Sequence, residues 1–170
     1  MSNNRILLIR AIEEAEGYSE LGMREHALRS LQRRGALVHG NGRACYMLGE
    51  ALRELGRYEE ALLPLERSAD LVPDDIHVFL ALGWCYKRTG QLGKAIAALE
   101  RAVRIDPSEA ILHYNLACYW SLGRNRTLAL KFLAHALEID TNFRDLIPDE
   151  PDFDPLRHDQ TFRLLTGVTV

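Results

Sequence analysis

The sequence predicts an all-α fold in which one helical hairpin is repeated along the chain, and three observations support this. Residues of matching size recur at an offset of 34, as at Leu48, Leu82 and Leu116. Within one period, apolar residues lie three and four positions apart, which is the spacing of one helix face. Proline closes two periods, at Pro73 and Pro107, where it stops a helix. Further sets at the same offset are Gly49, Gly83 and Ala117; Ala61, Ala95 and Ala129; Leu65, Leu99 and Leu133; Ser68, Ala102 and Ala136; and Leu71, Ile105 and Ile139.

The clearest hairpin is predicted over 76–109. One apolar face of its first helix is formed by Phe79, Leu82, Gly83 and Tyr86. A similar face of its second helix is formed by Ala95, Leu99, Ala102 and Val103. The small residues Gly83 and Ala95 let these helices approach closely, and Gly49 is expected to be a packing contact of the same kind in the preceding hairpin. A turn at 89–91 joins the helices, and the matching turns of the other hairpins are marked by Gly22, Gly56 and Gly123.

This hairpin resembles the tetratricopeptide repeat, with an aromatic residue in place of the usual tryptophan. The residues that match the repeat are Phe79, Leu82, Gly83, Tyr86, Ala95, Leu99 and Pro107. The resemblance implies a right-handed superhelix of helix-turn-helix hairpins, that is, an α-solenoid. We expect a single domain over 1–170, with repeats at 42–75, 76–109 and 110–141.

A degenerate repeat is predicted over 8–41. Glu14 stands where the repeat has leucine, and Arg34 replaces the small residue of the second helix. Such changes are expected of a terminal repeat, because no neighbour buries its outer face.

The repeat register ends after Asp140, and a C-terminal capping segment is predicted over 142–170. Three prolines in it forbid one continuous helix. We expect a helical turn near 142–146 and a capping helix that starts at Asp154-Pro155 and runs to about Leu165. The residues expected to cover the last repeat are Phe143, Leu146, Ile147, Phe153, Leu156, Phe162 and Leu165. The string 152–157 followed by Phe162 resembles the tail of bacterial members of the family.

Composition argues against several classes of partner. The net charge of −3 at pH 7 offers no electrostatic case for nucleic acid, because a duplex binder needs a stripe of Lys and Arg to neutralise phosphates. The apolar run at 6–9 is too short for membrane insertion. The three cysteines form no CxxC pair, which favours a reducing, cytoplasmic location.

Neighbouring repeats differ in charge. Four basic and eight acidic residues occur in 42–75, against five basic and three acidic in 76–109. Ordinary solvated helix faces explain such differences in most proteins. The alternative is that the repeats present opposite fields to one ligand.

The family resemblance also implies a binding site. Tetratricopeptide arrays hold peptides in a concave groove lined by the first helix of each repeat. Carried over to this chain, the partner-binding residues expected are Tyr46, Met47, Glu50, Arg53, His77, Leu80, Trp84, Lys87, Arg88, Tyr114, Asn115 and Cys118. Further groove positions fall at Arg43, Glu54, Ala81, Ile111, Ser121 and Leu122.

The character of this groove is apolar and aromatic at its centre. Of the residues with which some relatives clamp a C-terminal carboxylate, only Asn115 has a match, so no such clamp is expected. Trp84 and the tyrosines are the side chains that interaction surfaces use as anchors. The alternative is that Trp84 and Tyr114 pack between adjacent helices or under a terminal segment, with no ligand.

No pattern for catalysis, cofactor binding or metal binding was found. The histidines form neither HxxxH nor HExxH, and GxxxxGK[ST] and GxGxxG are missing. Acidic residues crowd 149–154, but this stretch lacks the central glycine and final glutamate of a calcium loop. We expect no enzyme activity, no cofactor and no metal.

The leading hypothesis is a non-catalytic adaptor that binds a peptide segment of a partner protein in the concave groove. A second hypothesis is self-assembly into a homo-oligomer through the degenerate N-terminal repeat, which leaves the apolar run at 6–9 uncovered. A third is a small secretion-type chaperone.

Overall fold

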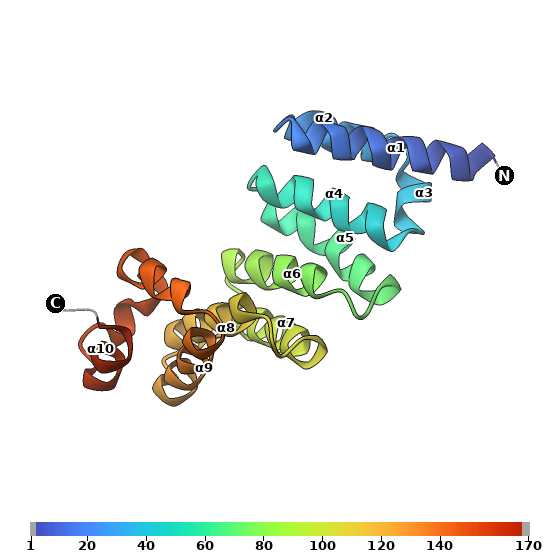
Figure 1. Ribbon diagram of the computed structural model, residues 1–170. Helices are drawn as coiled ribbons and strands as arrows, with labels where there is room; N and C mark the ends of the chain where they lie inside the picture. Colours follow the sequence, from blue (N-terminus) through green and yellow to red (C-terminus); the bar gives the residue numbers. More distant parts are fainter. Residues whose placement is uncertain (1–2, 168–170) are drawn as a thin grey trace. The chain divides into compact units, whose positions relative to one another are not determined.

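The computed structural model describes residues 3–167 and shows only helices in that part of the chain, which confirms the predicted all-α class (Figure 1). The elements are α1 (Asn3–Glu20), α2 (Arg24–Gln32), α3 (Gly35–His39), α4 (Gly42–Glu54), α5 (Tyr58–Leu71), α6 (Ile76–Arg88), α7 (Leu92–Ile105), α8 (Ala110–Leu122), α9 (Arg126–Ile139), the 3₁₀ helices η1 (Thr141–Asp149) and η2 (Pro151–Leu156), and α10 (Gln160–Thr166). Contacts divide the chain into two compact units, one ending at Gly90 and one starting at Gln91.

In the first unit, α4 and α5 form the most extensive hairpin contact. Gly49 is the reason they can approach so closely. A Cβ atom at this position would lie 2.5 Å from Cγ of the fully buried Leu65. The packing role expected for Gly49 is therefore confirmed.

The turns between paired helices share one backbone geometry. Gly22, Gly56 and Gly90 have φ angles of 70°, 74° and 75°, in the left-handed region that glycine enters most easily. The fourth turn contains Gly123, as predicted, but another residue adopts the left-handed geometry. Gly123 has an ordinary φ of −73°, and the left-handed residue is Arg124, with φ 55°. The offset of 34 from Gly90 leads to Arg124, so this repeat keeps the turn but has lost its glycine.

The second helix of the first hairpin is interrupted. It ends at Gln32, and α3 starts at Gly35 after a turn. Arg34 lies in this turn and is exposed. Arg34 is a long charged residue at a position where the repeat has a small packing residue. The helix is interrupted there, and the Arg34 side chain lies in solvent.

In the second unit, α8 packs against α9, and the segment after Asp140 packs on both. η2 contacts α8, whereas η1 and α10 contact α9. The expected cover is largely present, because Ile147, Phe153, Leu156 and Phe162 are buried. Leu146 is an exception, since 52% of it is exposed.

The predicted start of the capping helix is wrong. Asp154 and Pro155 lie inside η2 rather than at the start of α10. The cap of α10 is Asp159, whose carboxylate accepts a hydrogen bond of 2.9 Å from the Phe162 amide. The N-cap chemistry was anticipated, but at the wrong aspartate.

No helix within residues 3–167 combines the length and the apolar character needed to cross a membrane.

Candidate functional site

The predicted groove residues of α4 line a cleft between α1 and α4. The cleft has a volume of about 490 Å³. Tyr46, Met47 and Glu50 contribute to its wall, and all three are half-buried. The complete lining is Glu16, Ser19, Glu20, Arg43, Tyr46, Met47, Glu50, Ala51 and Glu54. Both walls belong to the first unit.

The α1 wall of this cleft was missed in the sequence. Glu16, Ser19 and Glu20 lie 34 residues before Glu50, Arg53 and Glu54, so they occupy the same groove positions one repeat earlier. The signal was available in the register. The degenerate repeat 8–41 therefore keeps groove positions on α1 although its packing positions depart from the repeat.

Arginines neutralise part of the acidic lining. Arg43 pairs with Glu16, and Arg24 pairs with Glu54 at 2.9 Å. Arg53 was expected to contact a ligand directly. In the structure it donates two hydrogen bonds of 2.7 and 2.9 Å to the Glu50 carboxylate, so it orients this glutamate within the lining.

The hydroxyl of Tyr46 experiences a net negative field. Its pKa is raised to about 12, mainly by burial and then by the carboxylates of Glu50 and Asp75, whereas Arg53 acts in the opposite direction. The neutral phenol is thus kept as a hydrogen-bonding group across the physiological pH range.

The predicted residues of α6 form a second accessible feature of the first unit. Trp84 is 38% exposed. Nζ of Lys87 lies 5.8 Å from the centre of its ring and the guanidinium carbon of Arg88 lies 5.6 Å from it, both within cation–π range. His77 is exposed and Leu80 is half-buried.

The predicted residues of α8 lie under the C-terminal segment. Tyr114 is only 4% exposed and Cys118 only 2%. The Tyr114 ring contacts Phe143 and Phe153, with ring centres 5.0 and 5.7 Å apart. Asn115 is half-buried. Tyr114 is therefore packed under the C-terminal segment, which was the alternative to its role in the groove. A partner could reach Tyr114 or Cys118 only if this segment moved away.

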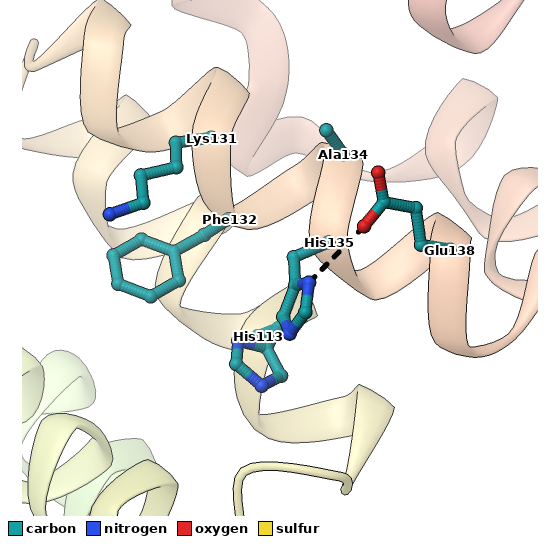
Figure 2. Close-up of a pocket in the computed structure, with 6 residues that line it drawn as sticks. All are labelled: His113, Lys131, Phe132, Ala134, His135 and Glu138. Carbon is teal, nitrogen blue, oxygen red and sulfur yellow. Dashed lines mark hydrogen bonds and ion pairs between the residues drawn. The ribbon is translucent and has the colours of Figure 1, made fainter.

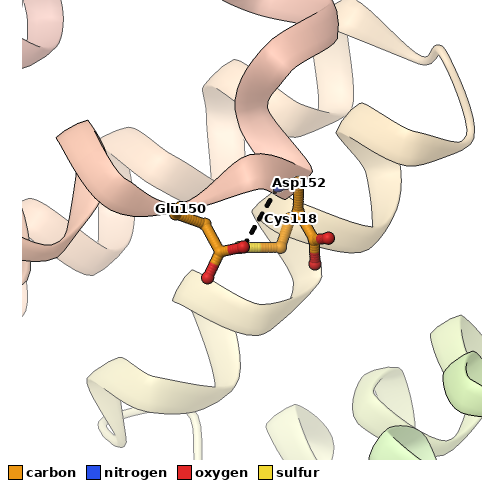
Figure 3. Close-up of side chains that lie close together, drawn as sticks. All are labelled: Cys118, Glu150 and Asp152. Atoms are coloured by element: carbon orange, nitrogen blue, oxygen red, sulfur yellow. Dashed lines mark hydrogen bonds between the residues drawn. The ribbon is translucent and has the colours of Figure 1, made fainter.

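The same segment places two carboxylates beside Cys118. Atoms of Cys118, Glu150 and Asp152 that could bind a metal lie within 4.8 Å of one another (Figure 3). One Glu150 oxygen, however, already accepts a hydrogen bond of 3.1 Å from the Asp152 amide as the cap of η2. This oxygen therefore has a structural role at the start of η2.

Another cavity, of about 500 Å³, lies between α8 and α9 (Figure 2). His113 hydrogen-bonds through Nε2 to the Pro107 carbonyl at 2.8 Å, and its ring lies edge-on to His135, with centres 4.4 Å apart. Nδ1 of His135 lies 3.3 Å from Glu138. These histidines come from different helices, so motifs within a single helix could not have revealed the pair. None of the cavity residues occupies a groove position expected from the repeat.

Two family models match the chain. The model described as "TPR repeat" matches residues 85–123, and the one described as "Tetratricopeptide repeat" matches residues 14–76. Together they cover more than half of the sequence. A comparison with curated proteins found no match.

Solved structures with a similar fold include MamA and YrrB. MamA from Desulfovibrio magneticus RS-1 is 24% identical, with a TM-score of 0.73 over 78% of this chain and 75% of that one. A further MamA structure has a TM-score of 0.75 at 24% identity, over 84% and 81% of the two chains. YrrB, described as a TPR protein with an unusual peptide-binding site, is 26% identical, with a TM-score of 0.71 over 75% of this chain and 66% of its own. The repeat register, the hairpin fold and these matches agree, and the chain belongs to the tetratricopeptide repeat family.

Proposed function

We propose that this protein is a non-catalytic scaffold that binds an extended peptide segment of a partner protein in the cleft between α1 and α4. The observation that supports this most directly is the lining of the cleft. On α4, all lining residues except Ala51 stand at groove positions that the family resemblance implies, and the α1 residues stand 34 positions before three such positions. The peptide-binding site named for YrrB is consistent with the proposal.

The cleft combines anchoring and orienting groups. Tyr46 and Met47 offer half-buried apolar surface, and the carboxylates of Glu50 and Glu54 offer hydrogen-bond acceptors. Trp84 on α6 provides a further aromatic anchor within the same unit. Because helices form these walls, little ordering of the protein accompanies binding, which favours affinity.

The rest of the predicted groove enters the proposal with different roles. His77, Leu80, Lys87 and Arg88 lie in the same unit as the cleft and are proposed as peripheral contacts, whereas Asn115 belongs to the second unit and stays outside this proposal. Tyr114 and Cys118 are left out of the direct contacts, because the C-terminal segment covers them. The cytoplasmic location and the lack of catalysis, cofactor and metal remain predictions from the sequence.

The test compares a Tyr46→Ala/Met47→Ala variant with wild type and with Leu63→Ala, an apolar truncation at a position on α5 that is 68% exposed. A partner is first identified by capture with wild-type protein, and its binding segment is mapped with overlapping peptides. The cleft variant should bind the mapped peptide about 10- to 100-fold more weakly, as expected for loss of two anchors. Leu63→Ala should bind as wild type. Equal affinity of all three proteins, at matched helicity, would refute the cleft model.

Self-assembly is a second candidate, because α1 carries exposed apolar side chains. Ile6 and Ile9 are 40% and 39% exposed on the same helix face. We propose that, if the chain forms homo-oligomers, this face takes part. Sedimentation velocity over a range of concentrations tests whether the chain forms homo-oligomers. A single monomeric species at all concentrations would refute self-assembly.

A further inference from the structure

The lining of the α1–α4 cleft is rich in carboxylates, three of which are paired with arginines. Four carboxylates enter it, from Glu16 and Glu20 on α1 and from Glu50 and Glu54 on α4, whereas Arg43 is the one cation of the lining among the described residues. We propose that the cleft selects a basic peptide, with a lysine or arginine side chain placed between the two helices. This inference rests on the proposed function and specifies the class of its ligand.

The four carboxylates differ in how firmly they are engaged. Glu50 accepts two hydrogen bonds from Arg53, and this pair is partly buried. The Glu50 side chain is 23% exposed and the Arg53 side chain is 28% exposed. The arginines that pair with Glu16 and Glu54 are more exposed to solvent. The side chain of Arg43, which pairs with Glu16, is 67% exposed, and that of Arg24, which pairs with Glu54, is 50% exposed. Surface pairs of this kind contribute little to stability, so an incoming cation can replace an arginine at small cost.

Glu20 provides the point of entry for such a cation. It makes no ion pair with any residue in 3–167, and it is exposed at the edge of the cleft. A lysine or arginine of the ligand can pair with Glu20 without displacing any group. From there it can exchange with the open arginine partners of the neighbouring glutamates.

The apolar part of the lining also suits a basic side chain. Tyr46 and Met47 both belong to the lining. An aromatic ring can attract a cation, and a methionine side chain can pack along the aliphatic stem of lysine or arginine. The carboxylates near the Tyr46 hydroxyl outweigh Arg53, so the field that a cation meets there is attractive. An acidic peptide would instead bring its carboxylates against four glutamates, and like-charge contacts of this kind reject the wrong partner.

The test uses three fluorescein-labelled peptides of equal length: a repeated Lys-Ala-Leu sequence, the same sequence with Glu for Lys, and the same with Ser for Lys. Binding to the full chain is measured by fluorescence anisotropy at low and at physiological salt. The lysine peptide should bind best, about tenfold or more tightly than the glutamate peptide, with a preference that weakens as salt screens the charges.

A matched pair of variants separates the cleft from the overall charge. Glu20→Gln/Glu54→Gln removes two charges from the lining, and Glu14→Gln/Glu59→Gln removes two exposed charges outside it. Only the first variant should lose affinity for the lysine peptide, by about five- to tenfold. Equal losses in both variants, no binding of the lysine peptide, or preference for the glutamate peptide would each overturn the inference. If all three peptides bind alike and Tyr46→Ala/Met47→Ala abolishes that binding, the cleft binds peptides but does not select their charge.

Discussion

Single backbone positions determine how closely the helices of a hairpin approach. At Gly49 the facing side chain, Leu65, occupies the space that a Cβ atom would need. At Arg124 the chain adopts a left-handed turn that three other repeats build with glycine. Gly49 follows the repeat pattern and Arg124 departs from it. Substitutions at these two positions should therefore change the free energy of unfolding in opposite directions.

Gly49→Ala should lower the free energy of unfolding by about 1–3 kcal/mol, because the added methyl group overpacks the α4–α5 contact. Gly93→Ala is the control. Gly93 lies in α7, and a Cβ atom there meets no other atom within 4 Å. That substitution should stabilise the protein by about 0.5–1 kcal/mol through helix propensity. Urea denaturation followed by circular dichroism measures both values, and a neutral Gly49→Ala would contradict the close packing.

Arg124→Gly should raise the free energy of unfolding by about 0.5–1 kcal/mol. The left-handed conformation is strained for arginine, and glycine relieves this at some cost in chain entropy. The midpoint of urea denaturation measures this change. Gly90→Ala is the reciprocal substitution, and it should destabilise the protein because Gly90 holds the equivalent left-handed turn. A drop in stability for Arg124→Gly would show that the side chain contributes more than the strain removes.

At the scale of elements, the segment 141–167 has the greatest consequence for the site. Its prolines and aromatic residues form two 3₁₀ helices and one short α-helix instead of a regular hairpin. Buried Phe153 and Phe162 fasten it in place, and Phe153 contacts the Tyr114 ring. It thereby covers the α8 surface that the repeat pattern assigns to the groove.

The thiol of Cys118 should report whether this segment stays in place. In a Cys45→Ala/Cys85→Ala background, Phe153→Ala should speed the reaction of Cys118 with Ellman's reagent by about tenfold or more, because loss of a large buried ring loosens η2. Leu164→Ala removes a side chain that is 79% exposed and should leave the rate unchanged. Equal rates for both variants, with unchanged helicity, would mean that η2 does not protect the thiol.

The attachment of α10 should weaken in acid. Hydrogen bonding to Arg126 holds the pKa of Asp159 below its usual value. Because the folded pKa is the lower one, the stabilisation is complete above the usual pKa near 4 and is lost as the pH falls through the folded value. Arg126→Gln should therefore lower the melting temperature at neutral pH, and its difference from wild type should shrink below about pH 4. Arg104→Gln, on α7, should show no such pH-dependent difference.

The sequence predicted those elements whose determinants are local. Periodicity placed the helices of the regular hairpins, and Gly49 was identified as a packing contact because its neighbours at the same offset are also small. The start of α10 could not be chosen in this way. Asp154 precedes a proline, as a helix cap often does, but it lies inside η2, and the cap of α10 is Asp159. Both aspartates have residue types suited to a cap, so local sequence does not distinguish them.

The candidate site was predictable to a similar extent. Tyr46, Met47 and Glu50 followed from the register, and Glu16 and Glu20 were within reach of the same offset. The covering of Tyr114 depends on contacts with Phe143 and Phe153, far along the chain, which no periodic pattern encodes.

At the scale of the whole molecule, the chain comprises two compact units, and the α1–α4 cleft belongs entirely to the first. The proposed site is therefore complete within one unit. The second unit carries its own terminal segment on α8. Contact between a partner peptide and the lining of the cleft is the central claim.

Photo-crosslinking in the native host tests this claim most directly. Tyr46, in the cleft wall, is replaced by p-benzoylphenylalanine, and the same residue is placed at Leu63, on the exposed surface of α5, as the control. Mass spectrometry then identifies the crosslinked protein and the peptide attached. We predict that position 46 captures one partner through a single basic segment and that position 63 does not. Capture of that partner from position 63 alone would contradict the account.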